Sequence, residues 1–207
     1  MTSNTAANPR IEFFDMIANQ WDGWHDLREL ACNLDASLAM FGIDPDATVV
    51  DAGCGTGNLT VSLLNGTLGP CGRIVAVDIS EKMLDLARRK VTDPRVAWHC
   101  GTADQLPLDD GTVDHVICFS SWPHFHDPAA VIREFRRVLR TGGALHILHL
   151  ISRSEVNRIH AQAHPSVHHD ILIPACETAK LLEMHGFRVI TMTDDDSRYL
   201  LTARKPG

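Results

Sequence analysis

The stretch Val49-Val50-Asp51-Ala52-Gly53-Cys54-Gly55-Thr56-Gly57-Asn58 decides the fold of this chain. Residues 48–50 are β-branched, which indicates a buried strand. The three glycines that follow tolerate positive φ angles and let the backbone approach a ligand with no Cβ in the way. A helix predicted to begin at Asn58 turns its free N–H groups towards the same space. The order of strand, acid, glycine turn and helix therefore predicts a site for a nucleoside-like ligand.

The composition is that of an ordinary globular protein. The chain has 207 residues, 44% hydrophobic and 22% charged, which suits one α/β domain with a large core. A net charge of −7 argues against a general binder of nucleic acid or anionic membranes. No apolar run approaches the ~20 residues that span a bilayer, so we expect no membrane insertion. Met1–Pro9 has no basic region before an apolar block, so we expect a frayed end and no signal peptide. The six cysteines form no C-x-x-C pair, so we expect reduced thiols in the cytoplasm.

Strands and helices alternate along the chain. Helices are predicted at 10–24, 26–41, from 58, 81–90, 128–139 and 175–185, with Thr141-Gly142-Gly143 ending the fifth of them. Strands are predicted at 48–50, 73–78, 95–99, 113–119, 144–150, 188–193 and 197–204. The last two flank the acidic turn 194–196, which indicates an antiparallel hairpin. We therefore predict an α/β fold, a doubly wound, Rossmann-like, mostly parallel seven-stranded sheet in a single domain over residues 1–207.

Two segments are expected to lie near the ligand. Residues 10–42 form two N-terminal helices, and the first carries Ile11, Phe14, Ile17 and Trp21 at helical spacing. This helix either docks on the domain or covers the ligand mouth as a lid. Residues 152–174 are the least regular part of the chain, and we expect this His-rich insert to fold over the same mouth.

Three acids fall at or just after the carboxyl ends of predicted strands: Asp51, Asp78 and Asp104. Asp78 lies 25 residues after Gly53, close to the spacing at which an acid meets ribose hydroxyls. A carboxylate there accepts two charge-assisted hydrogen bonds. No lysine or arginine lies near the glycine turn in sequence, which argues against a triphosphate ligand.

A family resemblance makes the nucleoside specific. Asp51–Gly57 reads Asp-Ala-Gly-Cys-Gly-Thr-Gly, and Val77–Ser80 reads Val-Asp-Ile-Ser. Further on, 101–107 reads Gly-Thr-Ala-Asp-Gln-Leu-Pro, 114–118 Asp-His-Val-Ile-Cys and 135–143 Phe-Arg-Arg-Val-Leu-Arg-Thr-Gly-Gly. Together these motifs resemble the class I S-adenosylmethionine-dependent methyltransferases, nearest the type 11 branch that includes quinone-biosynthesis C-methyltransferases. The resemblance covers residues 10–150 well and the last quarter only in architecture.

The resemblance implies a cofactor, S-adenosyl-L-methionine, and a role for each matching residue. Asp51 would reach the ammonium of the methionine part, Asp78 would hold the ribose hydroxyls, and Asp104 would accept from the adenine amino group. The remaining implied cofactor-binding residues border the methionine arm or the adenine: Gly53, Cys54, Gly55, Gly57, Asn58, Ile79, Met83, Thr102, Ala103, Phe119 and Ser120. Methyl transfer mainly requires alignment of the nucleophile and exclusion of water, so no catalytic base is assigned.

Histidines are unusually frequent, and eight of the twelve lie between residues 124 and 169. They are His124, His126, His146, His149, His160, His164, His168 and His169. We expect the substrate to lie over the ends of the fourth and fifth strands, in a pocket that includes Trp21, His124, His126 and His149. Three interpretations stay open for the histidine bias: surface or core residues without ligand duty, acid–base groups on an organic substrate, and a metal site.

The metal interpretation rests on spacing. His160 and His164 are four residues apart and would share a helix face, although Pro165 limits that helix. With His149 or His126 they would bind a divalent metal such as zinc that activates a thiol or oxygen substrate, or they would coordinate a metal carried by the substrate. The type 11 branch does not generally carry this histidine set.

Three functions follow from these observations. The first is an S-adenosylmethionine-dependent methyltransferase acting on a small molecule by direct in-line transfer. The second is a metal-dependent methyltransferase acting on a thiol, metal or tetrapyrrole-like substrate, and the third is a protein that binds the cofactor without catalysis. We expect no nucleic-acid partner. A homodimer is one arrangement compatible with the sequence, which leaves the oligomeric state open.

Overall fold

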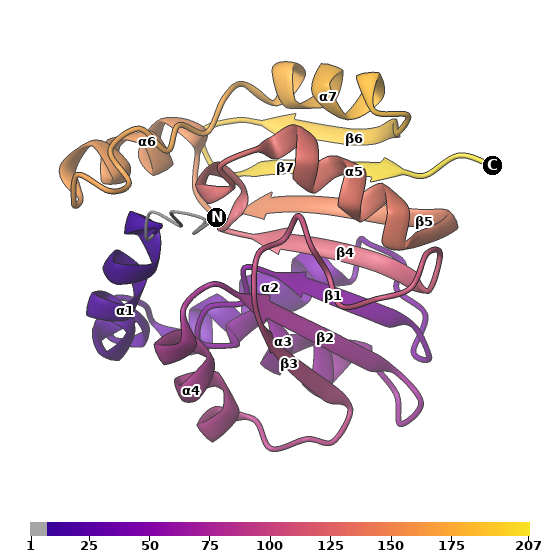
Figure 1. Ribbon diagram of the computed structural model, residues 1–207, viewed down its shortest axis with the longest axis horizontal. Coiled ribbons are helices and arrows are strands. Elements are labelled where there is room, and N and C mark those ends of the chain that lie inside the picture. Colours follow the sequence, from indigo (N-terminus) through magenta and orange to yellow (C-terminus); the bar gives the residue numbers. More distant parts are fainter. Residues whose placement is uncertain (1–7) are drawn as a thin grey trace, which may run out of the picture.

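The computed structural model describes residues 8–207. The frayed end was predicted for residues 1–9, of which 1–7 lie outside the described part. Asn8 and Pro9 are not frayed, because Asn8 caps the first helix and Pro9 begins it. The sheet has seven strands in the order β3-β2-β1-β4-β5-β7-β6 (Figure 1). β1 to β5 are parallel, whereas β7 runs antiparallel to both β5 and β6. The α/β fold and its C-terminal antiparallel hairpin are thus confirmed. The strands are β1 (Thr48–Ala52), β2 (Arg73–Asp78), β3 (Val96–Cys100), β4 (Val113–Phe119), β5 (Leu139–His149), β6 (Arg188–Asp194) and β7 (Tyr199–Arg204).

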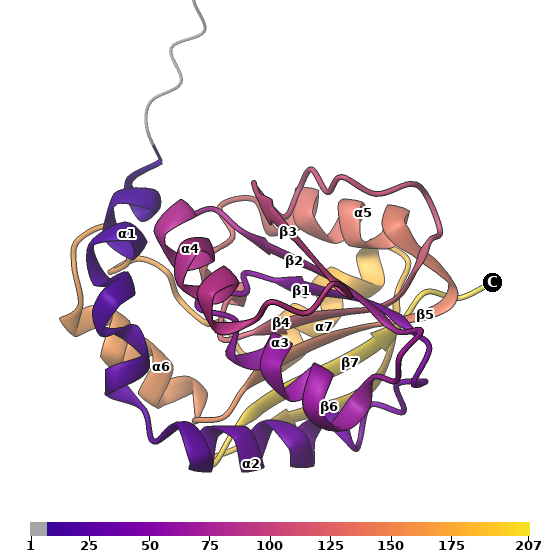
Figure 2. The same cartoon turned by 90° about the horizontal axis from the view of Figure 1, so that it is seen from below.

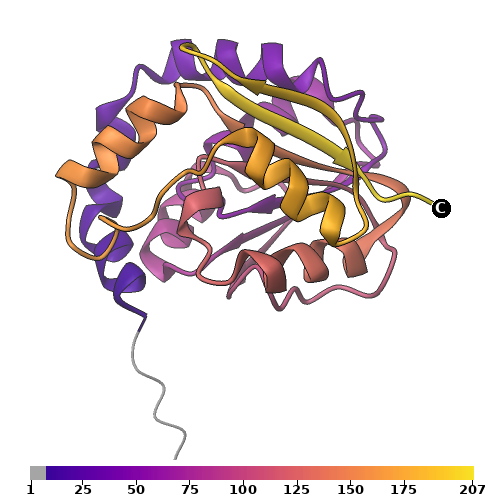
Figure 3. The ribbon, with the colours of Figure 1, turned by 90° about the horizontal axis from the view of Figure 1, so that it is seen from above.

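Helices cover both faces of the sheet. α5 and α7 pack on one face, and α2, α3 and α4 pack on the other, as the two views from below and above show (Figures 2 and 3). The helices are α1 (Pro9–Trp21), α2 (Leu27–Leu38), α3 (Asn58–Ser62), α4 (Glu81–Lys90), α5 (Pro128–Val138), α6 (Arg153–Gln162) and α7 (Ala175–Met184). Three single turns complete them: 3₁₀ turns at Asp22–Trp24 and Trp122–His124, and a π turn at Leu63–Thr67 that extends α3.

α5 illustrates how the sequence specifies these elements. Asp127 caps its N-terminus by accepting a hydrogen bond from the Ala130 backbone N–H at 2.9 Å, and Pro128 occupies the first turn. Val131 and Phe135, spaced by one helical turn, are fully buried against the sheet. This helix fixes the far end of the loop that follows β4.

The prediction that Thr141-Gly142-Gly143 ends α5 is wrong. α5 ends at Val138, and β5 begins at once with Leu139, five residues before the predicted strand start. Gly142, at a φ of +79°, lies within β5 where its pairing with β4 shifts register. A Cβ at Gly143 would stand 2.9 Å from the Arg140 carbonyl oxygen, so only glycine permits this close backbone approach.

The segment 152–174 is also more regular than its sequence indicated. Ser152 caps α6 by accepting a hydrogen bond from the Glu155 N–H at 3.2 Å, and the helix then runs to Gln162. The N-cap serine with an acid three residues on is a pattern typical of a helix start, but the sequence-based prediction overlooked it.

The site lies where the strand order reverses. β1 has β2 on one side and β4 on the other, so their carboxyl ends open onto one crevice. α1 and α6 stand beyond the ends towards which β4 and β5 point (Figure 1). α1 is held there through Ile17 and Ala18, which are buried with Met83 of α4. No helix in residues 8–207 is long and apolar enough to cross a membrane.

Candidate functional site

The glycine turn after β1 forms the floor of the site. Gly53, Gly55 and Gly57 all adopt positive φ angles, of +74°, +52° and +82°. A Cβ on Gly53 would stand 2.4 Å from the Cβ of Ser121, so this glycine permits the contact between the turn and the loop after β4. A Cβ on Gly55 would meet no atom within 4 Å, which leaves open space above the turn for a ligand.

Asp78 holds the glycine turn in place. One carboxylate oxygen accepts a hydrogen bond from the Gly55 N–H at 2.8 Å, and the other accepts from the Ser80 N–H at 2.9 Å. Burial raises the pKa of Asp78, and these backbone donors oppose that shift. Each oxygen keeps a lone pair, so the carboxylate can still accept from ligand hydroxyls in the crevice.

Two further acids have a buried oxygen without a hydrogen-bond partner among the described residues. Asp51 accepts from the Thr60 hydroxyl at 2.7 Å through Oδ2, but its Oδ1 is unpaired. Burial, reinforced by the charge of Asp78, raises the pKa of Asp51 to about 7. Oδ1 of Asp104 is likewise buried and unpaired. Unpaired buried acceptors are costly, so both acids fit the amino groups of a ligand.

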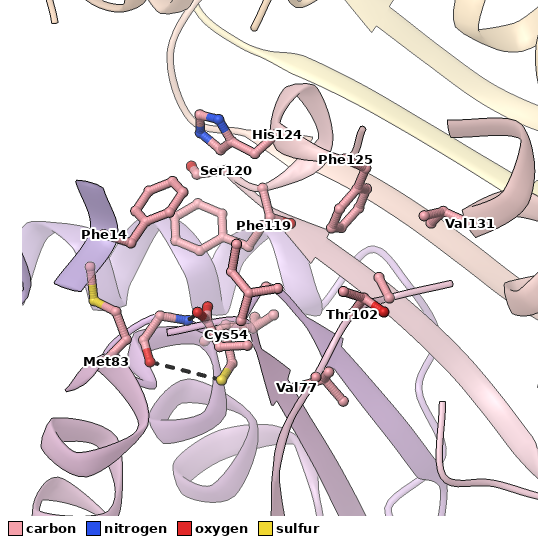
Figure 4. Close-up of a pocket in the computed structure, with 18 of the residues that line it drawn as sticks. Phe14, Cys54, Val77, Met83, Thr102, Phe119, Ser120, His124, Phe125 and Val131 are labelled. Carbon is pink, nitrogen blue, oxygen red and sulfur yellow. Dashed lines mark hydrogen bonds between the residues drawn. The ribbon is translucent and has the colours of Figure 1, made fainter. Parts of the chain in front are cut away.

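A cavity opens between the glycine turn, the carboxyl ends of β2 and β4, and α1 (Figure 4). It is lined by most of the residues expected to bind the cofactor: Gly53, Cys54, Gly55, Asn58, Asp78, Ile79, Met83, Thr102, Ala103, Asp104, Phe119 and Ser120. Trp21, His124 and His126, which the sequence suggested for a substrate pocket, also line this cavity. Asp51, Gly57 and His149 do not, because Asp51 and His149 are buried behind the wall and Gly57 packs against Ala87 and Trp98.

Sequence reasoning missed part of the cavity wall. Phe14, Thr56, Ser121, Phe125 and Asp127 all line it. In the close-up, Phe119 lies between Phe14 and Phe125, so three aromatic rings line the cavity (Figure 4). The helical spacing on α1 was a signal for Phe14, but the same spacing also fits simple docking on the domain.

Ser120 has the strained backbone expected of a functional turn. It is the one non-glycine residue in the described part of the chain with a positive φ, at +53°. Its N–H donates to the Leu148 carbonyl at 2.9 Å, which fixes the loop after β4 to β5. The next residue, Ser121, donates to the Ala52 carbonyl at 2.6 Å and joins this loop to the glycine turn.

The end of α1 is tied directly to the glycine turn. Asp22 accepts from the Thr56 hydroxyl at 2.6 Å and the Asn58 amide at 3.1 Å, and it pairs with Lys90 at 2.7 Å. Lys90 also donates to the Asn58 side-chain oxygen at 2.8 Å. A lysine therefore does reach the turn, contrary to the sequence-based expectation, although it does so from α4 and with its charge balanced by Asp22.

His124 is connected to the segment after α6. Its Nδ1 lies 2.8 Å from Oδ2 of Asp170, a side chain that is almost fully buried. Arg10 of α1 donates from Nε to the same Oδ2 at 3.0 Å and pairs with Oδ1. Burial raises the pKa of Asp170, but the hydrogen bonds from His124 and Arg10 outweigh it and the net shift is downward. His160 approaches the Asp170 backbone carbonyl through its Nδ1.

The proposed metal ligands do not come together. α6 ends at Gln162, so His160 and His164 do not share a helix face, and His164 instead stacks on Phe13 with ring centroids 5.7 Å apart. His149 is buried against Tyr199, and burial, with a smaller effect from His124 and His160, lowers its pKa to about 3. Residues 8–207 hold no group of three or more His, Cys, Asp or Glu side chains placed to bind a metal ion. The metal prediction is therefore not supported.

His146, one of the buried histidines of the biased region, belongs to the core. His146 of β5 is fully buried, and its Nε2 lies 3.0 Å from Nδ1 of His115. Its other ring nitrogen lies 3.0 Å from the Thr202 hydroxyl, and Phe41 stacks on the ring at 3.9 Å. This histidine has a structural role, far from the cavity lining.

Comparisons with known proteins agree with the geometry. Residues 50–147 match a family described as a methyltransferase domain. The chain is 44% identical over 97 residues to an uncharacterized methyltransferase of Mycobacterium tuberculosis, covering 47% of this chain and 37% of the relative. It is 33% identical over 139 residues to a demethylmenaquinone methyltransferase of Lactiplantibacillus plantarum, covering 64% and 58%. The chain thus spans less than two thirds of the length of these curated relatives.

Solved structures share the fold. A putative methyltransferase in complex with the Haloferax volcanii Trm112 methyltransferase activator superposes with a TM-score of 0.77 at 22% identity, covering 94% of this chain and 98% of that one. An S-adenosylmethionine-dependent methyltransferase from Aquifex aeolicus superposes with a TM-score of 0.68 at 21% identity, covering 96% and 98%.

Proposed function

Because residues 50–147 match a methyltransferase-domain family, we propose that this chain is an S-adenosylmethionine-dependent methyltransferase and that it methylates a small molecule bound in the cavity. The observation that carries the proposal is the set of acids around the glycine turn. Asp78 and Asp104 both line the cavity, and Asp104 brings a buried acceptor that has no partner within the described residues. Such an acceptor fits a ligand amino group, and the neighbouring carboxylate fits ribose hydroxyls.

The cofactor fits the residues present. S-adenosylmethionine, when bound, supplies a methyl group on a positively charged sulfur. Asp78 would hold the ribose, Asp104 the adenine amino group, and Gly55 would leave room for the ligand above the turn. Ile79 and Met83 would pack on the adenine, and the remaining cofactor-binding residues would keep the roles that the family resemblance implies. Asp51 lies behind the wall, so it would act on the methionine ammonium through a water.

α1 would close the site. Phe14 and Trp21 line the cavity from this helix, and Asp22 bonds to Thr56 and Asn58 beside the glycine turn. In this arrangement α1 excludes water from the reacting groups and holds the substrate over the ends of β4 and β5. Holding two reactants in line in this way supplies about 7–11 kcal/mol of the barrier reduction.

Calorimetry tests the cofactor site. We expect the protein to bind S-adenosylmethionine and S-adenosylhomocysteine, and we expect Asp78→Ala to weaken both by at least about 100-fold because two charge-assisted hydrogen bonds are lost. Asp85→Ala is the matched control, since Asp85 is an exposed carboxylate on α4 outside the cavity lining. Absence of binding, or equal affinities for the two variants, would contradict the proposal.

Turnover separates an enzyme from a protein that only binds the cofactor. The wild-type protein is incubated with methyl-labelled S-adenosylmethionine and the small-molecule fraction of a cell extract. Label in an extractable small molecule, lost in Asp78→Ala and kept in Asp85→Ala, supports methyl transfer. Binding without transfer to any fraction supports the non-catalytic alternative instead.

A further inference from the structure

The cavity contains a histidine that is oriented by a buried carboxylate. His124 lines the cavity in the loop after β4, and its Nδ1 is 2.8 Å from Oδ2 of Asp170. Asp170 is held in turn by Arg10, whose Nε donates at 3.0 Å to Oδ2. The three residues come from three separate parts of the chain, so this geometry exists only in the folded protein.

The pairing determines which nitrogen of His124 is available. An ionised Asp170 only accepts hydrogen bonds, so Nδ1 of His124 carries the proton in this contact. Nε2 is then the basic nitrogen, and it has no hydrogen-bond partner among residues 8–207. A histidine fixed in this tautomer by a carboxylate has the arrangement of a general base.

The walls of the cavity restrict the substrate. Phe14 meets His124 edge to face at 5.1 Å, and Phe119 and Phe125 line the space beside them (Figure 4). Aromatic walls favour a planar aromatic ligand through offset or edge-to-face contacts.

The basic nitrogen restricts the nucleophile. A thiol, with a pKa of about 8.5, is partly ionised near neutral pH without help, whereas a phenolic hydroxyl, with a pKa of about 10, is not. An imidazole accepts the proton of a phenol more readily than that of an aliphatic alcohol, because the alcohol is a much weaker acid. A phenolic hydroxyl is therefore the nucleophile to which this base contributes most.

On the proposed function, we infer that the site methylates the hydroxyl oxygen of a planar phenolic molecule, with His124 as the proton acceptor and Asp170 as its positioning residue. The substrate hydroxyl gives its proton to Nε2 of His124, and its oxygen forms a bond to the methyl carbon. The carbon–sulfur bond breaks, and its electron pair stays on the sulfur, which becomes a neutral thioether. The imidazolium that forms is stabilised by Asp170 and later returns its proton to water.

Other charged and titratable groups face this histidine from every element around it. They are Arg10 of α1, Asp78 at the end of β2, His149 of β5, His160 of α6 and Asp170. Arg10 balances the charge of Asp170, so docking of α1 and orientation of the base are coupled.

The test measures ionisation of a phenol in the site, without requiring turnover. The probe is 4-nitrocatechol, whose phenolate absorbs at a longer wavelength than the phenol. It is titrated with pH in the protein loaded with S-adenosylhomocysteine. We expect the bound probe to ionise at least about 1 pH unit below the free probe, because an imidazolium forms beside the phenolate.

The variants separate the proposed roles from general folding. His124→Gln should abolish the shift, and Asp170→Asn should reduce it, with S-adenosylhomocysteine affinity unchanged in both. His169→Gln is the control, because His169 is exposed and adjacent to Asp170, and it should keep the wild-type shift. If Asp170→Asn fails to fold, Arg10→Met replaces it as the variant that disturbs the carboxylate.

The outcomes separate this inference from the proposed function. If the wild-type protein does not bind S-adenosylhomocysteine, the proposed function is refuted. The inference about His124 alone is overturned if S-adenosylhomocysteine binds normally and one of three results is found. These results are no binding of 4-nitrocatechol, no shift of its ionisation, or a shift that is also present in His124→Gln.

Discussion

Replacing Asp104 by alanine should weaken cofactor binding without weakening the fold. Oδ1 of Asp104 is buried and has no hydrogen-bond partner in the described structure, although the residue lines the cavity. A carboxylate oxygen that lacks a hydrogen-bond partner in the free protein contributes little to folding stability. Any favourable interaction it makes must therefore be with the bound ligand. Asp104 therefore allows a structural role and a binding role to be told apart in one variant.

The size of the effect follows from hydrogen-bond energies. A hydrogen bond to a charged acceptor contributes about 1.5–3 kcal/mol, which corresponds to a roughly 10- to 150-fold loss of affinity. An unsatisfied buried acceptor costs about 1–3 kcal/mol in the free protein. Removing it should leave the free energy of unfolding unchanged or raise it by roughly 1 kcal/mol, after some lost packing.

Two measurements on one pair of variants check this. Calorimetry gives the affinity for S-adenosylhomocysteine, and urea unfolding of the free protein gives the stability. Asp109→Ala is the matched control, because Asp109 lies in the same loop, is exposed and does not line the cavity. The reasoning is refuted if Asp104→Ala loses more than about 2 kcal/mol of stability while its affinity stays within threefold of the wild type.

Three further outcomes are expected. Gly53→Ala and Gly55→Ala both force alanine to a positive φ, which costs about 1–2 kcal/mol. Only the new methyl group at residue 53 would meet a side-chain carbon, at 2.4 Å, so urea unfolding should show that Gly53→Ala is clearly the less stable variant. Equal losses of unfolding free energy in the two variants would contradict this reasoning. Burial lowers the pKa of His115 to about 4 and that of His146 well below its usual range, so the unfolded chain binds more protons than the folded one as pH falls from about 6.5 to 4. The free energy of unfolding should therefore fall on acidification by up to about 1.4 kcal/mol per pH unit and proton, and a flat pH profile in this window argues against it. Asp22→Ala should release α1 and speed hydrogen exchange of its amides, whereas unchanged exchange shows that the carboxylate does not hold the helix.

The elements of the sheet were predictable because their signals are local. β2 at Arg73–Asp78, β4 at Val113–Phe119 and α4 at Glu81–Lys90 match the predicted ranges. Continuous apolar runs predict buried parallel strands, and a serine cap with a periodic apolar face predicts a helix. The start of β5 was not predictable, because a Gly-Gly pair reads equally as a helix stop and as a bulge. Pairing with β4 and β7 decided between the two.

The same division applies to the site. Most of the residues between Gly53 and Asp104 that line the cavity were identified from the sequence, because they lie near the carboxyl ends of strands that open onto the crevice. The sequence also showed the concentration of histidines between residues 124 and 169, but it did not predict the role of each histidine. Their four-residue spacing predicted that His160 and His164 share one helix face. The structure shows that they do not, because α6 ends at Gln162, before His164.

By itself, the sequence determined the fold class, the glycine turn and the acids that surround it, since strand, turn and cap preferences act over a few neighbouring residues. The tertiary structure decided which distant side chains meet. It buried His146 in the core, brought Lys90 to the glycine turn and joined His124 to Asp170 and Arg10. These contacts link residues up to 160 positions apart. They depend on how whole elements pack, and packing is not encoded in any local pattern of residues.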